Sequence, residues 1–593
     1  YNPSLAVKIE KHKMEVWPGY VTAIAKFEQK VMLMSDISHK LLSSQTVEDV
    51  LQSCYSSDSK AYQDNAKRKL VGQIVLTRYN NKTYRIDDID FSQNPQSRFG
   101  TTSRRFRPNA AAGAGDAAGE TMISYNEYYA ETHNINIHNQ NQPLLVSRPK
   151  KADIRRGQEG NYYLIPSLCS LTGLSDEMFK DFTVMKDLAV HTRVGPDGRY
   201  RNLTMFIDKI NKTEKAVAEL RGWNLKFAND LVRVQGRHFP AEQISQGNAK
   251  YSYDPRRADW DREMRGKPLT EAKALKTWLF LFAGRRDQAN AQNFVQTLCR
   301  VGRGMGFNIN QPEVVEVESP HTNAFTHALR SRIRPDHQMV VCMLPTNKKD
   351  LYDNIKQICC VERPVPSQCL ISKTVSRQDR VMSVATKIAI QMNMKLGGQA
   401  WFVDIPFNGT MICGIDTYHD SSKKGRSVSA LVCSMNKNAT QYFSKVTYQM
   451  NHMELAQGLT INMIAALKNF HEINGNLPQK IFIYRDGVGD GQVDIVFNTE
   501  LTQIWKAFKE IGVQYNPKVG VIIVQKRINT RLFTGGHSIQ NPPPGVVVDS
   551  VVTRQELFDF FLVSQSVRQG SVTPTHYNVI YDSMGLKPDY YQR

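Results

Sequence analysis

The chain has 593 residues, and its 76 Lys and Arg outnumber its 56 Asp and Glu, which gives a formal net charge of +20. At about 150 residues per domain this length predicts several packed units, and a 41% share of apolar residues excludes wholesale disorder. The longest apolar runs, residues 278–283 and 519–524, are far shorter than the roughly 18 residues that a membrane-spanning helix needs, so no membrane span is expected.

The excess of positive charge points to a polyanionic partner. Nucleic acid is the leading candidate, and a generally basic, highly soluble surface is the alternative. The nine cysteines include no CxxC pair, which favours buried free thiols in a reducing compartment over zinc binding. The chain begins at Tyr1 rather than at a Met, which indicates a fragment that could have lost targeting information.

The first 300 residues predict a β-rich domain followed by a connector. Residues 1–30 carry mixed charge and fit either a strand pair or a linker. Residues 109–119 are rich in Ala and Gly without apolar periodicity, which predicts a flexible loop or linker with no catalytic residues. The β-branched and aromatic stretches predict strands at residues 73–77, 82–86 and 144–146, and residues 162–168 are expected to close the domain. From about 170 to 330 the pattern predicts a long connector with helices at residues 175–188 and 203–220.

From residue 338 onward, apolar strands alternate with amphipathic helices, which predicts α/β layers. The expected strands are residues 339–344, 411–415, 481–484 and 521–524. Asp416 and Asp486 follow two of these strands, at the carboxyl ends where open α/β sheets place their sites. Either residue could instead be a turn or helix-cap residue.

Several convergent carboxylates would suit phosphodiester hydrolysis, because close like charges are tolerable when divalent cations bridge them. Glu454 precedes a helical apolar spacing and could supply a third carboxylate, and His576 could supply a neutral imidazole. In the alternative interpretation, Glu454 stabilises a helix N-terminus and His576 is a structural histidine.

These residues resemble the catalytic tetrad of the Argonaute superfamily. The resemblance rests on the order Asp416, Glu454, Asp486 and His576, on residues 484–492 (Tyr-Arg-Asp-Gly-Val-Gly-Asp-Gly-Gln) and on residues 574–579 (Pro-Thr-His-Tyr-Asn-Val). Residues 187–193, Asp-Leu-Ala-Val-His-Thr-Arg, indicate the Piwi clade.

The resemblance implies a multidomain α/β fold with a β-rich module: an OB-like PAZ domain, a Rossmann-like MID domain and an RNase H-like PIWI domain. The expected order is a linker or N-domain remnant (1–30), PAZ (31–170), a helical linker (171–300), MID (301–400) and PIWI (401–593). Family members continue beyond the position of Arg593, so we expect a C-terminal tail to be missing.

The resemblance also implies a role for each member of the tetrad. Asp416, Asp486 and His576 would hold two Mg²⁺ ions, for which Mn²⁺ could substitute, and Glu454 would enter as a mobile finger when a guide is loaded. His419 and Asp420 have no counterpart in the tetrad and are interpreted as local structure.

A second predicted site would bind the 5′ phosphate of a guide. Tyr352 and Lys356 are four residues apart on one predicted helix, and Lys387, Gln391 and Lys395 are so spaced on another, which a solvated helix surface explains equally well. Within the resemblance, Tyr352, Lys356, Gln368 and Lys395 match the MID pocket, whose charge-assisted donors suit a phosphate dianion. Gln391 stands where many Argonautes have Lys, which implies that another Mg²⁺ supplies the missing charge.

A third predicted site would bind the guide 3′ end, because aromatic faces stack nucleobases and enclose methyl groups. Its candidates in the β-rich domain are Tyr79, Lys82, Tyr84, Tyr128 and Tyr129. Some of these must instead belong to a Tyr-rich core. The resemblance favours Tyr84 and Tyr129 and implies a 2′-O-methylated 3′ terminus.

The resemblance implies an RNA-guided endoribonuclease that uses a piRNA guide to cleave complementary target RNA, with transposon transcripts as expected targets. It also implies Tudor-type partners and a germline location, in cytoplasmic granules or in the nucleus. One alternative is a guide-dependent RNA-binding protein that silences by recruiting partners, with little or no cleavage. Another is an RNase H-like nuclease that works without a guide.

Overall fold

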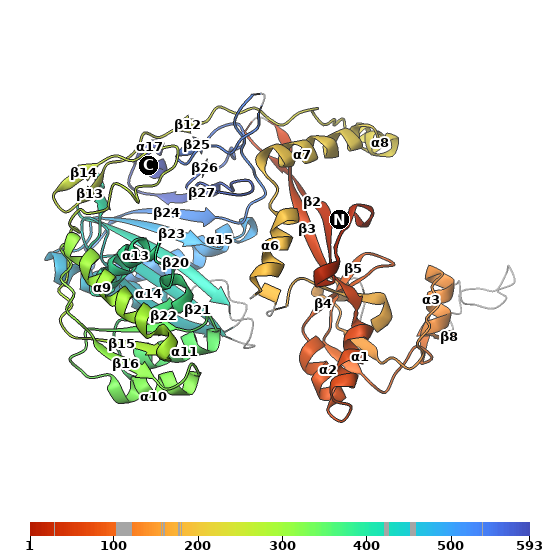
Figure 1. The fold of residues 1–593 in the computed structure, drawn as a ribbon. Coiled ribbons are helices and arrows are strands. Elements are labelled where there is room, and N and C mark those ends of the chain that lie inside the picture. Colours follow the sequence, from red (N-terminus) through yellow and green to blue (C-terminus); the bar gives the residue numbers. More distant parts are fainter. Residues whose placement is uncertain are drawn as a thin grey trace.

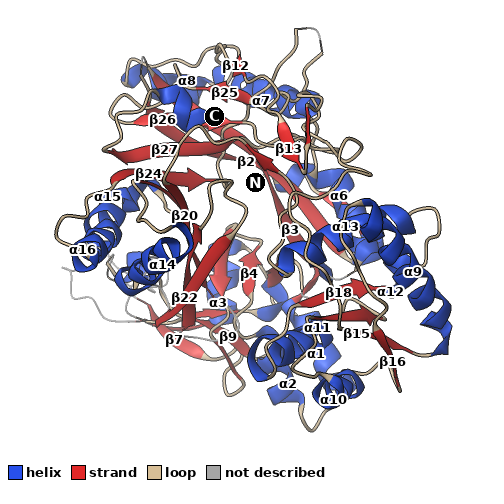
Figure 2. Ribbon diagram, turned by 90° about the vertical axis from the view of Figure 1, so that its left-hand side faces the viewer, coloured by secondary structure: helices blue, strands red, loops and turns tan. Residues whose placement is uncertain are grey.

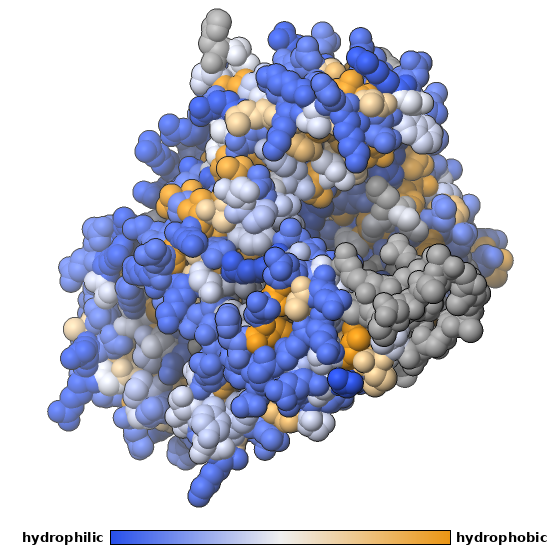
Figure 3. Space-filling view, turned by 90° about the vertical axis from the view of Figure 1, so that its right-hand side faces the viewer, coloured by the Kyte–Doolittle hydropathy of each residue, from blue (hydrophilic) through white to orange (hydrophobic). Residues whose placement is uncertain are grey.

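The computed structural model describes residues 1–593 apart from residues 29, 102–120, 156, 158–159, 176–177, 180, 420–425, 451–457 and 537. The expected loop at 109–119 therefore lies outside the described residues, as do Asp420 and Glu454. Figure 1 shows two halves, with the chain from the N-terminus to α8 (Glu214–Gly222) on the right and the rest on the left. The face in Figure 3 is largely hydrophilic with scattered hydrophobic residues, in keeping with the high net charge.

The N-terminal half is built on a long antiparallel hairpin. Strands β2 (Met14–Lys26) and β3 (Val31–Thr46) pair along the whole length of β2, so the strand-pair interpretation of the first thirty residues is right. The six-stranded sheet has the order β1-β2-β3-β11-β4-β5. Its other strands are β1 (Val7–Ile9), β4 (Ile74–Thr77), β5 (Lys82–Arg85) and β11 (Cys169–Thr172).

Short helices and smaller sheets pack around this sheet. Helix α1 begins with a capping box in which Thr46 and Asp49 satisfy each other's backbone N–H groups. The helices are α1 (Val47–Ser57), α2 (Tyr62–Leu70), α3 (Tyr125–His133) and α4 (Lys151–Ile154). The strands are β6 (Asp88–Asp90), β9 (Leu144–Ser147) and β10 (Tyr162–Leu164) in one sheet, and β7 (Arg98–Thr101) and β8 (Thr121–Ser124) in another. The predicted strands of this half are therefore present.

Helices α6 (Phe182–Thr192) and α7 (Pro196–Asn211) lead from the first half to the second (Figure 1). The sequence predicted helices here, although with different bounds. After α8 the chain contributes β12 (Arg237–His238) to the largest sheet, and β13 (Ile244–Gln246) and β14 (Ala249–Tyr251) pair with β19 (Phe402–Val403). None of the helices in the described part of the chain has the length and hydrophobicity that crossing a bilayer requires.

A parallel four-stranded sheet follows, in the order β16-β15-β17-β18. Its central strand β15 (Trp278–Ala283) is fully buried, so the α/β region begins near residue 278 and the prediction of residue 338 is wrong. Residues 278–283 are an apolar run within the predicted connector, so this strand was missed. It pairs with β16 (Glu313–Val317) and β17 (Met339–Leu344), and β17 pairs in turn with β18 (Ser367–Ile371).

Helices cover both faces of this sheet, and their packing follows the alternation of side chains along β15. Trp278, Phe280 and Phe282 pack with α9 (Gln288–Gly304) and α13 (Val381–Lys395) on one face. Leu279 and Leu281 pack with α10 (Thr322–Arg332) and α11 (Lys349–Gln357) on the other. A short helix, α12 (Ser372–Val375), precedes α13.

The largest sheet has nine strands in the order β12-β25-β26-β27-β24-β23-β20-β21-β22. Strands β20, β23 and β24 run parallel at its centre, and α14 (Leu459–Asn474) and α16 (Thr502–Ile511) pack on one face (Figure 2). The strands are β20 (Thr410–His419), β21 (Arg426–Ser434), β22 (Tyr442–Met450), β23 (Lys480–Asp486), β24 (Lys518–Gln525), β25 (Val546–Val548), β26 (Phe558–Leu562) and β27 (Thr575–Asp582). Short helices α15 (Val493–Val496) and α17 (Pro588–Gln592) complete this half.

A buried ionic cluster joins the two halves. Asp36 on β3 is 3% exposed and is paired with Arg199 of α7 and Arg531 of the loop after β24. Arg531 lies 2.8 Å from the Asp36 carboxylate, and Arg199 also donates to the Ser571 hydroxyl. Burial lowers the pKa of Arg531, so Asp36 is what makes this buried cation tolerable.

We predict that Asp36→Asn weakens this joint, because two buried guanidinium groups would lose their counter-charge at a cost of about 3–5 kcal/mol. Hydrogen–deuterium exchange of α7 and of the loop around Arg531 should become faster. Asp197→Asn is the matched control, since its pair with Arg201 on α7 is largely exposed and worth at most about 1 kcal/mol. Equal exchange in the two variants would contradict the role of the cluster.

Candidate functional site

Asp416 and Asp486 lie side by side where the parallel pairing of β20 with β23 ends: Asp486 is the last residue of β23, and Asp416 lies within β20. Residues 414 and 415 of β20 pair with Tyr484 and Arg485 of β23, so the next residue on each strand is the aspartate. Gly487 takes a positive φ of 81° immediately afterwards, and a Cβ atom there would lie 3.8 Å from the Asp416 carboxylate. The prediction that the two acids meet at one edge of the sheet is confirmed.

The two carboxylates line a cavity of about 800 Å³ between the sheet, the tip of the β2–β3 hairpin and the loop after β24. Four basic side chains also line it: Lys26, Lys526, Arg527 and Arg554. The Lys526 ammonium lies 2.5 Å from the Asp486 carboxylate, and this hydrogen bond raises the pKa of Lys526. The carboxylate edge therefore already attracts a cation.

A buried salt bridge on the opposite face of β23 holds the backbone that carries Asp486. Arg485 makes two hydrogen bonds to Glu500, at 2.8 and 2.9 Å, and both side chains are almost fully buried. A guanidinium nitrogen of Arg485 also donates to the Asp486 carbonyl. Because the paired fork of Arg and carboxylate has a fixed geometry, it restrains the position of Asp486.

His576 contradicts the prediction that it is a metal ligand. Its Nε2 lies 2.7 Å from the Asp559 carboxylate and its Nδ1 lies 2.8 Å from the Gln525 side-chain oxygen, so both ring nitrogens are engaged. His576 pairs with Gln525, whereas Tyr577 belongs to the row that includes Val524 and Asp486. Because side chains alternate along a strand, His576 is one residue out of phase with the carboxylates. It is a buried structural histidine, stacked on Phe561, in the cavity wall.

The residues present fit a divalent cation with oxygen ligands, although the described residues give only part of a ligand set. Asp416 and Asp486 supply carboxylate oxygens, which Mg²⁺ prefers, and the Lys526 ammonium shows that positive charge is favoured there. The parts of the chain that the structure describes contain no group of three His, Cys, Asp or Glu arranged around a metal position. His419 bonds to Ser427 at 2.7 Å, which confirms its interpretation as local structure.

The predicted 5′-phosphate residues converge at the end of the four-stranded sheet. Lys356 of α11 and Lys395 of α13 both donate to the carbonyl oxygen of Ser367, at 3.2 and 2.8 Å. Lys356 also lies over the Tyr352 ring, with 5.6 Å from its ammonium to the ring centroid. Desolvation, and then repulsion by Lys356, lower the pKa of Lys395.

Two glutamine side chains complete this group. Gln368 accepts a hydrogen bond from Lys395 at 2.7 Å and donates one to Gln391 at 3.2 Å. All five predicted residues therefore belong to one connected cluster, in which Tyr352 remains 46% exposed. Two cations that share one carbonyl acceptor form a site that an anion would stabilise.

The predicted 3′-end residues fall into two groups. Tyr79, Tyr128 and Tyr129 pack together, with ring centroids 5.2 Å apart for Tyr79 and Tyr129 and 5.3 Å for Tyr128 and Tyr129. Tyr84 belongs instead to the core cluster beneath the six-stranded sheet and contacts Tyr162, and the Lys82 side chain is exposed.

The exposed fraction of each ring distinguishes the tyrosines that belong to the core from those that an RNA could contact. Tyr129 is only 3% exposed and accepts or donates a 3.0 Å hydrogen bond with Tyr79, so it is a core residue and its ring is not open to a nucleobase. Burial raises the pKa of Tyr79 to about 12. Tyr79 and Tyr128 remain partly accessible and are the better candidates for contact with RNA.

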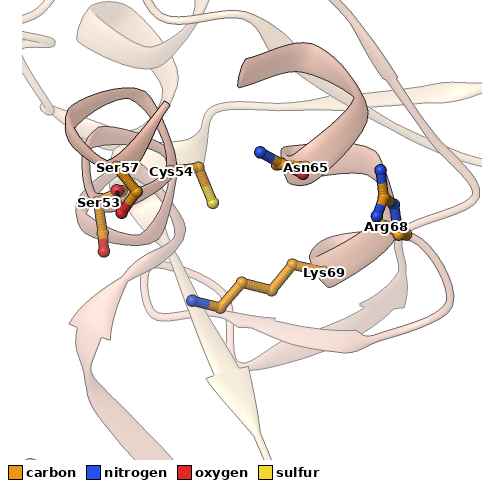
Figure 4. A pocket seen from close by; sticks show the side chains of 6 residues that line it. All are labelled: Ser53, Cys54, Ser57, Asn65, Arg68 and Lys69. Carbon is orange, nitrogen blue, oxygen red and sulfur yellow. Dashed lines mark hydrogen bonds between the residues drawn. The ribbon is translucent and has the colours of Figure 1, made fainter. Parts of the chain in front are cut away.

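Sequence reasoning missed Lys526, Arg485 and Glu500. Lys526 directly follows an apolar strand, so the rule that located Asp416 and Asp486 could also have located it. The Arg485–Glu500 pair left no such signal, because its partners come from different elements. Another pocket, of about 360 Å³, lies between α1 and α2 and contains none of the predicted residues (Figure 4).

Comparison with known proteins gives two family matches. A model of the PAZ domain matches residues 48–195 and a model of the Piwi domain matches residues 339–593. The chain is 43% identical to "Piwi-like protein 1" of Gallus gallus and 42% identical to that of Danio rerio, in each case over 100% of its own length. It spans 66% and 67% of the length of these relatives. The crystal structure of Drosophila Piwi superposes with a TM-score of 0.80 at 34% identity, covering 100% of this chain and 75% of that one.

We predict that Asp486→Asn abolishes binding of Mn²⁺ at the carboxylate edge, because a carboxylate ligand is lost, and that His576→Gln leaves the Mn²⁺ affinity within about two-fold. His576→Gln should instead lower stability, since a buried hydrogen-bonded group that loses its partner costs about 1–3 kcal/mol. Electron paramagnetic resonance of Mn²⁺ and the thermal midpoint separate these effects. A large loss of Mn²⁺ affinity in His576→Gln would restore His576 as a ligand.

Proposed function

This chain belongs to the Piwi clade of the Argonaute proteins, and from that premise we propose that it binds a guide RNA by its 5′ phosphate and cleaves the RNA paired with that guide. The chain spans about two thirds of its relatives, so the proposal concerns the part described here. It combines an anion site on the four-stranded sheet with a carboxylate edge on the nine-stranded sheet.

The main support for guide binding is that the ammonium groups of Lys356 and Lys395 both donate to one carbonyl oxygen, that of Ser367. Lys356 and Lys395 repel each other at the Ser367 carbonyl, and the lowered pKa of Lys395 reflects burial and this repulsion. A terminal phosphate dianion would offer each lysine a charge-assisted hydrogen bond and would remove the repulsion. Tyr352, exposed beside them, would stack on the first base.

Cleavage would take place at the carboxylate edge. Asp416 and Asp486 would hold divalent cations, and a bound pair of Mg²⁺ ions would supply an activated water and stabilisation of the leaving oxygen. Lys526 would offset the charge of Asp486 until metal and RNA arrive, and Arg485 with Glu500 would hold Asp486 in place. Glu454, expected as a further ligand, lies outside the described residues.

Other parts of the proposal rest on the family resemblance. Tyr79 and Tyr128 would contact the guide 3′ end, and a 2′-O-methyl group there would find apolar ring faces. Base pairing with the guide would select the target, and transposon transcripts are the proposed targets. Tudor-type partners, a Mg²⁺ ion near Gln391, and germ granules or the nucleus as the location are proposed on the same basis.

We predict that Lys356→Ala and Lys395→Ala each weaken loading of a 5′-phosphorylated guide by roughly 10- to 100-fold, because a hydrogen bond to a charged group is worth about 1.5–3 kcal/mol. Lys387→Ala is the matched control, because Lys387 lies on α13 with Lys395 but its ammonium pairs with Asp261 at 2.7 Å. Filter binding with 5′-phosphate and 5′-hydroxyl guides measures the effect. Equal loading of the two guides by the parent protein would refute the phosphate site.

We predict that the loaded protein cuts a labelled complementary RNA at one guide-defined bond in Mg²⁺ and not in EDTA. Asp486→Asn should lower the cleavage rate by more than about 100-fold, the upper end of what loss of an outer-shell metal partner costs. Gel analysis of the products checks both results. Guide-dependent binding without any cleavage would favour the recruitment alternative, and degradation without a guide would favour the guide-independent nuclease.

A further inference from the structure

Three neighbouring strands at the edge of the nine-stranded sheet carry a row of side chains in which two exposed tyrosines flank a half-buried valine. In the pairing of β20, β21 and β22, Tyr418 lies opposite Val428 and Val428 lies opposite Tyr448. Residues directly opposite one another in a sheet point to the same face, so the three side chains form one cross-strand row. Tyr418 is 65% exposed and Tyr448 is 76% exposed.

This row lies on the same face as the carboxylate edge. Asp416 and Tyr418 are two residues apart on β20, so they share a face at a separation of about 7 Å. The residues that alternate with them, Cys413 and Ile415, belong to the core beneath α14 and α16. Tyr418 itself lines the cavity that contains Asp416, Asp486 and Lys526. The row therefore extends from the cavity to β22, the edge strand of the sheet, whose backbone Figure 2 shows.

The chemistry of the path favours RNA over a protein partner. Tyr418 joins the row to a cavity that is lined by Lys26, Lys526, Arg527 and Arg554, so an occupant that reaches from the row into the cavity meets a concentration of positive charge. Tyrosine faces stack nucleobases whatever their sequence, and the neighbouring row on this face runs from Asp416 through Ala430 to the exposed Val446. Two spacings between strands separate Tyr418 from Tyr448 by about 10 Å, which a stacked nucleic-acid strand covers in about three nucleotides.

We propose that Tyr418, Val428 and Tyr448 form a stacking platform for the target RNA strand where it leaves the cavity, beside the bond to be cut. The proposal rests on the proposed function, since it assigns the path of the RNA whose scissile bond lies at Asp416 and Asp486. The platform binds the strand by ring and apolar contact, independently of base sequence, and so holds the flanking nucleotides while the carboxylate edge positions the bond.

The test uses the full chain with Asp486→Asn, loaded with a 5′-phosphorylated guide, so that binding is measured without cleavage. Fluorescence anisotropy with a complementary RNA gives the target affinity, and retention of labelled guide gives loading in the same sample. Tyr418→Ala combined with Tyr448→Ala is expected to weaken target binding about ten-fold or more while guide loading is unchanged. Tyr418→Phe with Tyr448→Phe should restore most of the affinity, because the ring faces remain.

Tyr442→Ala is the matched control. Tyr442 lies on the same strand and face of β22 and is 58% exposed, but it stands at the other end of the strand, opposite Ser434, and its hydroxyl donates to the Ala439 carbonyl. Replacing Tyr442 removes a tyrosine from the same strand, with a similar effect on β propensity, but Tyr442 does not belong to the row that reaches the cavity. Target affinity within about two-fold of the parent is expected for this variant.

Photocrosslinking locates the RNA independently of affinity. Target RNAs with 4-thiouridine at successive positions are expected to crosslink to β20 and β22 only from nucleotides adjacent to the cleavage position. Normal guide loading and target binding in the Tyr→Ala pair, or crosslinks that never reach these strands, would overturn the platform and leave the proposed function standing. Failure of the parent protein to load the guide would instead overturn the proposed function.

Discussion

Mutual repulsion of two carboxylates is the constraint around which the second half of the molecule is organised. Strands in register are about 4.8 Å apart, and two unit charges at that separation repel by roughly 3 kcal/mol at an effective dielectric constant near 20. The parallel pairing of β20 with β23 brings the backbones of Asp416 and Asp486 to about this separation. Lys526 offsets their charge from the cavity side, and the buried Arg485–Glu500 pair fixes the strand from the other side. The repulsion between the two carboxylates lowers the stability of the fold unless a bound cation offsets it. For this reason the carboxylate edge is suited to binding a cation.

The same logic with the opposite sign applies to the lysine pair of the four-stranded sheet. Lys356 and Lys395 come from helices on opposite faces of that sheet and meet at its edge, over Ser367. A surplus of positive charge at one place and of negative charge at the other prepares the molecule for a phosphate group and for metal ions. Both charged groups lie next to the ends of strands. There, backbone groups such as the Ser367 carbonyl can form hydrogen bonds with partly buried side chains.

Most apolar strands of the second half and the acids that follow them could be predicted from the sequence, because a buried strand needs a run of apolar residues; β15 is the exception. The predicted strand at residues 339–344 coincides with β17, and Asp416 and Asp486 meet as expected. Pairing and register could not be predicted. His576 and Tyr577 are adjacent in sequence, and the strand register places their side chains on opposite faces of the sheet. Tyr128 and Tyr129 are likewise adjacent in sequence, and only the packing of α3 decides which of them is buried.

The ionic cluster at Asp36 gives the long hairpin a fixed end. From Asp36 to Thr46, where the strand ends and α1 begins, β3 extends roughly 33 Å at about 3.3 Å per residue. A rotation of about 10° at the anchored end would carry the far end through roughly 6 Å, since displacement grows with the length of the arm. If the hairpin moves as a rigid body about this ionic cluster, a small rotation near the carboxylate edge would become a larger displacement at its far end.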